Sequence, residues 1–167
     1  MITEDVVVIG VGNTFRRDDG AGPAVVEALR GKVPATLAVT DGEPARLIEL
    51  WSGAPLAIVI DAVRADPPHP GRVHEMDMEE TGRQTLIQEG SGPAASSHAL
   101  GLEHAVDLGR AVDRMPRRLR VHAIEGLDFG LGPGLTPQVE EAAKGVARRI
   151  ETLLAPRGSA DRSGADT

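Results

Sequence analysis

The feature that most constrains the fold of this chain is its alternation of short apolar runs with segments that carry helix signals. The apolar runs have the length of buried strands and comprise residues 6–9, 37–40, 56–60 and 119–124. The helix-like segments comprise residues 23–30, 44–51, 96–115 and a segment that begins at Thr136. Such alternation is typical of a mainly parallel sheet covered on both faces. We therefore predict a single three-layer α/β domain over residues 1–156, with a twisted central sheet of about five strands.

Three further segments complete the predicted fold. Residues 72–78 alternate apolar and polar side chains, as a half-exposed edge strand would, whereas residues 81–95 are polar and are expected to form a flexible loop. Residues 157–167 have no apolar stripe to bury and are predicted to be a disordered tail. The last helix is expected to bury one stripe, which consists of Val139, Ala142, Val146, Ile150 and Leu153.

The composition argues against several classes of protein. Aromatic residues make up only 2% of the chain, so the core must be aliphatic, as in a buried parallel sheet. The formal net charge is −7 without any basic run, which disfavours nucleic acid and anionic membranes as partners. The absence of cysteine excludes disulfides, thiolate metal sites and a cysteine nucleophile. Because no signal peptide or apolar run of ~20 residues is present, we expect a cytoplasmic protein.

The glycine-rich loop after the first strand is a weak match to a dinucleotide site. Gly10 and Gly12 follow the strand, but the position of the third glycine in that fingerprint is occupied by Phe15. Asp18 and Asp19 follow, and they would repel an anionic pyrophosphate. The sequence therefore does not predict a tightly bound organic cofactor.

The same loop contains two adjacent carboxylates. Either aspartate could flank the first helix, where the helix dipole favours negative charge, and this role suffices for Asp18. Two neighbouring carboxylates repel each other unless a cation or another partner joins them. Asp19 is therefore a candidate metal ligand or acid/base group.

Two more polar residues fall where parallel sheets bind ligands, at the carboxyl ends of strands. Asp61 directly follows the most apolar run, where a carboxylate needs water, a hydrogen bond or a cation; the alternative is a turn cap. His98 lies at an expected helix start, where the dipole favours the neutral, metal-binding imidazole; the alternative is a polar first-turn residue. Together with Asp19, these groups form an open set of two oxygen ligands and one nitrogen ligand that suits a divalent metal. The residues alone indicate a metal-contacting enzyme and do not identify its substrate.

Five segments in order resemble the nickel-iron hydrogenase maturation endopeptidases over about residues 6–155. They are Gly10-Val11-Gly12-Asn13 with Asp18-Asp19-Gly20-Ala21-Gly22, Asp41-Gly42, Ile60-Asp61-Ala62, Ser97-His98-Ala99-Leu100-Gly101-Leu102 and Gly134-Leu135-Thr136-Pro137-Gln138-Val139. Each segment is weakly specific by itself, whereas the ordered set is fairly specific.

The resemblance implies an aspartic-type endopeptidase that removes a short C-terminal peptide from a nickel-loaded hydrogenase large-subunit precursor. The family's metal-contacting residues match Asp19, Asp61 and His98, which would act as both catalytic and nickel-contacting groups. The nickel would come with the substrate, and we expect the enzyme to be a monomer. Which group activates the attacking water stays open at this point.

Two departures from the family pattern have consequences. Some members carry glutamate at the position of Asp19, which implies a shorter reach toward the metal here. The residues after Asp41-Gly42 are Glu43-Pro44-Ala45-Arg46 instead of a small residue and threonine, which implies a stiffer loop and a different choice of substrate. Two other classes remain as alternatives: a nickel sensor or carrier without peptidase activity, and a nucleotide-binding α/β enzyme.

Overall fold

A computed structural model of the chain describes residues 5–79, 84–88 and 102–156. The predicted tail and His98 lie outside these residues. So does the beginning of the helix expected from residue 96.

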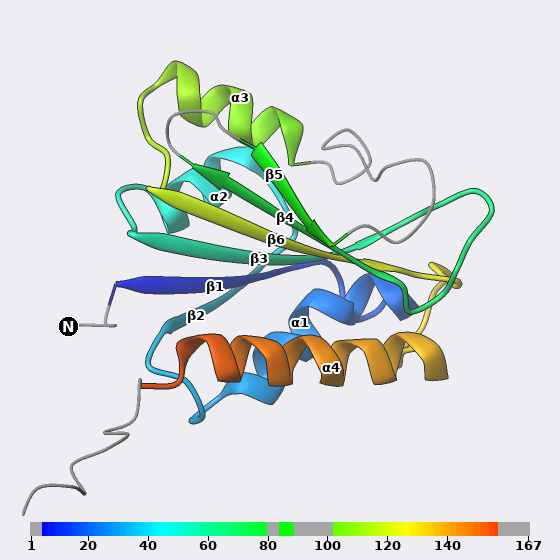
Figure 1. The fold of residues 1–167 in the computed structure, drawn as a ribbon. Helices are drawn as coiled ribbons and strands as arrows, with labels where there is room; N and C mark the ends of the chain where they lie inside the picture. Colours follow the sequence, from blue (N-terminus) through cyan, green and yellow to red (C-terminus); the bar gives the residue numbers. More distant parts are fainter. Residues whose placement is uncertain (1–4, 80–83, 89–101, 157–167) are drawn as a thin grey trace, which may run out of the picture.

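The centre of the molecule is a six-stranded sheet with the order β2-β1-β3-β6-β4-β5 (Figure 1). Neighbouring strands β2, β1, β3 and β6 pair in parallel, whereas β4 runs antiparallel to both of its neighbours, β6 and β5. The strands are β1 (Val6–Val11), β2 (Thr36–Thr40), β3 (Leu56–Val63), β4 (Val73–Glu79), β5 (Gln84–Gln88) and β6 (Arg118–Glu125). The predicted mainly parallel α/β sheet is confirmed, with one strand more than expected.

Helices cover both faces of the sheet and complete three layers. In Figure 1, α1 and α4 lie together on one face, and α2 and α3 lie on the other. The helices are α1 (Ala21–Leu29), α2 (Pro44–Trp51), α3 (Glu103–Ala111) and α4 (Pro137–Leu154), with a 3₁₀ turn η1 (Arg17–Gly20) before α1. Each face has its own hydrophobic core, since alternate residues of the central strands point to opposite sides, and Trp51 is the one aromatic residue among the buried core residues described. None of the described helices is long and apolar enough to cross a bilayer.

Two predictions at the edge of the sheet are wrong. Residues 72–78 are not an edge strand, because β5 pairs with β4 on the side away from β6. Residues 84–88 of the expected loop form β5 instead. A five-residue edge strand is paired on one side only and requires few apolar residues, so its sequence resembles that of a polar loop.

The two later helices also differ from the prediction in their limits or faces. Helix α3 ends at Ala111, four residues before the expected end at Met115, and Asp113 beyond it has a φ of 54°. On α4, Leu153 is 45% exposed, and Leu154 is buried in its place. A stripe read from spacing alone can choose the wrong member of an adjacent apolar pair, because neighbouring positions are 100° apart on a helix.

Close contact between backbone segments fixes the beginning of α1 against the sheet. A Cβ atom on Gly10 would lie 2.5 Å from the carbonyl oxygen of Gly22, and one on Gly22 would lie 2.6 Å from that of Val11. Only glycine fits at these two crossing points. The η1 turn is thereby held at the carboxyl ends of β1 and β3, where the candidate site lies.

Candidate active site

A cleft of about 400 Å³ opens at the carboxyl ends of β1, β2 and β3. Its charged lining residues are three aspartates, namely Asp19, Asp41 and Asp61, and two arginines, namely Arg16 and Arg64. Asp19 and Asp61 therefore share the surface on which the sequence placed them. His98 lies outside the described residues, and within those residues no three histidine or acidic side chains form a metal-binding group.

Asp61 is the most deeply buried carboxylate of the cleft. It lies inside β3, opposite Ala123 of β6, and not directly after the strand as the sequence suggested. Its side chain is 8% exposed. Burial, together with the negative charge of Asp19, raises the pKa of Asp61 to about 7, although a backbone hydrogen bond from Ala62 acts in the opposite direction. A carboxylate in this position gains stability from any cation that enters the cleft.

Asp19 belongs to the η1 turn and is only partly buried. Its Oδ2 atom accepts a hydrogen bond of 2.9 Å from the backbone amide of Asn13. Gly12 allows this approach, because its φ of 141° and its contact with the Asp19 backbone leave no room for a side chain. The glycine-rich loop thus serves to seat Asp19 beside Asp61.

Asp18 lies in the turn before the first helix, as the sequence suggested, but it also has a structural role that the sequence did not predict. It is fully buried, and its carboxylate accepts hydrogen bonds of 2.8–2.9 Å from the backbone amides of Leu127, Asp128 and Thr136. The Thr136 hydroxyl donates to it as well. Burial raises the pKa of Asp18, but these hydrogen bonds outweigh the effect and hold the pKa below its usual value. Asp18 therefore anchors the loop of residues 126–136 to the η1 turn.

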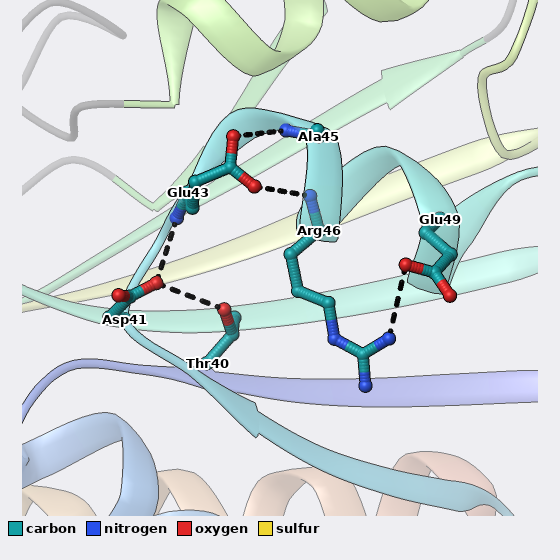
Figure 2. Close-up of polar contacts among 6 residues, drawn as sticks. All are labelled: Thr40, Asp41, Glu43, Ala45, Arg46 and Glu49. Carbon is teal, nitrogen blue, oxygen red and sulfur yellow. Dashed lines mark hydrogen bonds and ion pairs between the residues drawn. The ribbon is translucent and has the colours of Figure 1, made fainter.

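Asp41 is a member of the cleft that the sequence analysis did not single out as a site residue. It directly follows β2, so the rule for carboxyl ends of strands could have found it. Figure 2 shows that its Oδ1 atom accepts hydrogen bonds from the Thr40 hydroxyl, at 3.5 Å, and from the Glu43 amide, at 3.2 Å. Asp41 is exposed and turned toward its own loop.

Glu43 caps the helix that follows Asp41. Its carboxylate accepts hydrogen bonds of 3.1 and 3.0 Å from the amides of Ala45 and Arg46, and Pro44 occupies the first turn (Figure 2). A cap followed by proline fixes the entry of the chain into α2. These contacts provide a physical reason for the expected stiffness of the loop. The Glu43 carboxylate binds the amides at the start of α2 and is not directed into the cleft.

Phe129 and the two arginines of the cleft were also not predicted. Arg64 lies over the Phe129 ring, with its guanidinium carbon 4.5 Å from the ring centroid. Arg16 donates a hydrogen bond of 3.3 Å from Nη2 to the Phe129 carbonyl. These contacts join residues that are 65 and 113 positions apart, and no local pattern in the sequence marks them.

Comparison with known proteins identifies the family of the chain. The family model described as hydrogenase maturation protease matches residues 23–153. The chain belongs to this family. The hydrogenase 2 maturation protease of Escherichia coli K12 is 26% identical over 157 residues, which cover 92% of each chain. The HupD expression/formation protein of Thiocapsa roseopersicina is 25% identical over 142 residues, which cover 82% of this chain but only 62% of that protein.

Solved structures of similar proteins share the fold. The hydrogenase maturating endopeptidase HybD from E. coli superposes with a TM-score of 0.67 at 24% identity, covering 89% of this chain and 91% of the other. HybD from Thermococcus kodakarensis gives the same TM-score and identity over 89% and 98% of the two chains. This family member therefore shares the α/β fold of these solved structures.

Two histidines of this maturation protease, one partly buried and one buried, belong to its scaffold. His74 Nε2 lies 2.8 Å from Oε2 of Glu125, so the partly buried His74 is paired with a buried carboxylate. His122 is 2% exposed; burial lowers its pKa to about 4, against the attraction of nearby Glu75. Neither histidine lines the cleft of Asp19 and Asp61.

Proposed function

We propose that this protein is an endopeptidase that removes the C-terminal peptide of a nickel-iron hydrogenase large-subunit precursor after nickel has been inserted. The observation that carries the proposal is Asp61, a buried carboxylate beside Asp19 in an open cleft. Burial and the negative charge of Asp19 raise its pKa to about 7, so a cation that reached Asp61 would favour the charged carboxylate. A metal ion presented by the substrate would supply that cation.

In this mechanism, nickel is part of the substrate and not a resident cofactor. Asp19 and Asp61 provide two oxygen ligands and His98 provides a nitrogen, a mixed set that suits a divalent transition metal with open positions. Binding of the precursor's nickel would hold the scissile peptide bond in the cleft. Nickel-free precursor lacks this attachment and is not cleaved.

Hydrolysis requires activation of water in the same cleft. Either the substrate's nickel polarises the peptide carbonyl or the water, or one of the carboxylates accepts the proton of the attacking water. The proton then passes to the nitrogen of the leaving peptide as the carbon–nitrogen bond breaks. A carboxyl group whose pKa lies near 7, such as Asp61, can exchange a proton at neutral pH.

The decisive experiment incubates the purified protein with nickel-loaded and with nickel-free precursor and follows both by mass spectrometry. We expect one C-terminal cleavage of the nickel-loaded form only. Asp61→Asn and His98→Ala should each lower the rate by about a hundredfold or more while the protein stays folded. Tight binding of free nickel without cleavage would instead support a carrier or sensor.

A further inference from the structure

The candidate active site is lined by residues of opposite charge. Asp19, Asp41 and Asp61 line it from the ends of the strands and the η1 turn, whereas Arg16 and Arg64 line it beside Phe129. The proposed function uses carboxylates to contact a metal ion. It leaves the two guanidinium groups without a role.

Phe129 holds both guanidinium groups in place. It stacks under Arg64 through its ring and accepts the hydrogen bond of Arg16 through its carbonyl group. The ring itself rests on Gly126, where a Cβ atom would lie 2.5 Å from Phe129 Cζ. The loop that carries Phe129 is anchored by the buried carboxylate of Asp18. The two cations are therefore attached to a built platform and are not simply mobile surface side chains.

Neither cation has an anionic partner among the residues that the structure describes. The ion pairs there involve other arginines and histidines, and Asp19, Asp41 and Asp61 are not paired with Arg16 or Arg64. A stacked guanidinium uses its face for the ring and keeps its N–H donors free at the edge. Both arginines thus present unused donors at the cleft.

We propose that Arg16 and Arg64, held by Phe129, form a subsite that binds a carboxylate of the substrate peptide. This inference rests on the proposed peptidase function and adds a chemical preference to it. The aspartates contact the metal ion, and the two arginines fix the chain on one side of the scissile bond. An acidic peptide segment is therefore preferred to a neutral or basic one.

A carboxylate fits this subsite better than a phosphate group. Arginine binds a planar carboxylate through two parallel hydrogen bonds. A phosphate would bring a charge close to −2 into a cleft that three aspartates also line. A single negative charge in one plane is attracted by the arginines with less repulsion from these aspartates. Two sources can supply it, namely an acidic side chain near the cleavage point or the α-carboxylate at the end of the peptide.

The first experiment measures cleavage of nickel-loaded precursor by Arg16→Gln and Arg64→Gln. We expect KM to rise about five- to tenfold for each, with kcat within about twofold, because exposed charge-assisted hydrogen bonds contribute binding energy of that order. Arg64→Lys should recover only part of the loss, since lysine keeps the charge without the planar fork. Arg30→Gln is the matched control, because Arg30 is an exposed arginine that pairs with Glu27 outside the cleft.

The second experiment changes the substrate. One precursor carries amides in place of the acidic side chains near the cleavage point, and another carries a C-terminal carboxamide. The precursor that lacks the bound carboxylate should be cleaved with raised KM by the wild type, and Arg64→Gln should then cause no further loss. Such non-additivity identifies both the subsite and the source of the carboxylate.

Peptide binding separates failure of the subsite from failure of the proposed function. A synthetic peptide with the sequence of the precursor's C-terminal extension is titrated, in carboxylate and amide forms, into wild type and Arg64→Gln and followed by NMR. If the wild type cleaves precursor but KM is unchanged in both arginine variants, the subsite is refuted and the peptidase stands. If the wild type cleaves nothing yet binds the peptide in an Arg64-dependent manner, the peptidase is refuted and the subsite stands. Equal binding of both peptide forms by both proteins refutes the subsite in either case.

Discussion

Two buried aspartates near the glycine-rich loop show opposite solutions to the burial of a carboxylate. Asp18 is fully buried and receives hydrogen bonds from three backbone amides and a hydroxyl, which hold its pKa low. Asp61 is nearly as buried, but burial raises its pKa to about 7 despite the amide of Ala62. The first charge is stabilised by the protein itself. The second is costly to the protein until a cation or proton arrives.

The contrast shows that burial alone does not distinguish a structural carboxylate from a functional one. The number of hydrogen-bond donors around the carboxylate makes the distinction, because buried polar groups in a stable scaffold are normally satisfied. Asp18 belongs to the scaffold by this criterion. Asp61 and its partly buried neighbour Asp19 belong to the site.

The largest expected effect concerns the pH dependence of stability in Asp61→Asn. Folding raises the pKa of Asp61 from 3.8 to about 7. The contribution of Asp61 to the stability of the wild type therefore falls as the pH rises from about 4 to 7, and it then stays constant. The variant lacks this loss, so above pH 7 its free energy of unfolding should exceed that of the wild type by up to about 4 kcal/mol. Urea unfolding of both proteins from pH 4 to pH 8 measures the difference.

The test uses the difference between the free energies of unfolding of the two proteins at each pH, because His122 changes the stability of both in the opposite direction. Its lowered pKa makes stability fall as pH drops from 6.5 to about 4 in both proteins. A constant or inverted difference would show that Asp61 is already satisfied in the folded protein.

The next largest effect is expected for Asp18→Asn. The variant places an amide group, which is itself a donor, against the backbone donors of Leu127, Asp128 and Thr136. We expect a loss of about 3 kcal/mol, which lowers Tm by roughly 6–12 °C in a domain of this size. Calorimetry at pH 7.5 measures this loss. A melting temperature equal to that of the wild type would remove Asp18 from the scaffold and end the contrast with Asp61.

A smaller effect is expected where a carboxylate receives donors but remains exposed. Glu43 accepts hydrogen bonds from two amides at the start of α2 (Figure 2). Glu43→Ala should destabilise the protein by about 1 kcal/mol, the usual contribution of a helix cap. Chemical unfolding can resolve a change of this size. A loss of stability as large as that of Asp18→Asn would mean that the number of hydrogen-bond donors alone, and not the burial of the carboxylate, determines the size of the loss.

The smallest effect is expected for the exposed ion pair of Arg46 and Glu49, whose charged atoms are 3.2 Å apart (Figure 2). Glu49→Gln removes one charge where solvent screens both. We expect a change below about 0.5 kcal/mol that decreases further in high salt. The same unfolding assay serves, and a loss above 1 kcal/mol would contradict the assumed screening.

The sequence predicted the parts of the site that depend on the strand pattern. Ligands of parallel sheets bind at the carboxyl ends of the strands, and this rule placed Asp19 and Asp61 at the same edge of the sheet. Asp19 lies in the loop after β1, and Asp61 lies near the end of β3. It could not reveal the partners of Asp18, which lie 109 to 118 positions away, or the stacking of Arg64 on Phe129. Contacts between loops depend on the completed fold and leave no periodic signal in the chain.

The tight crossing of Gly10 and Gly22 has a consequence for how the specificity of this scaffold can change. A side chain at either position would collide with backbone atoms, so neither position can be varied without moving α1 away from the sheet. Diversity must therefore enter through the surrounding loops, such as residues 43–46 and 127–131. A mutant library aimed at a new precursor would concentrate its randomised codons in those two loops and leave the glycines untouched.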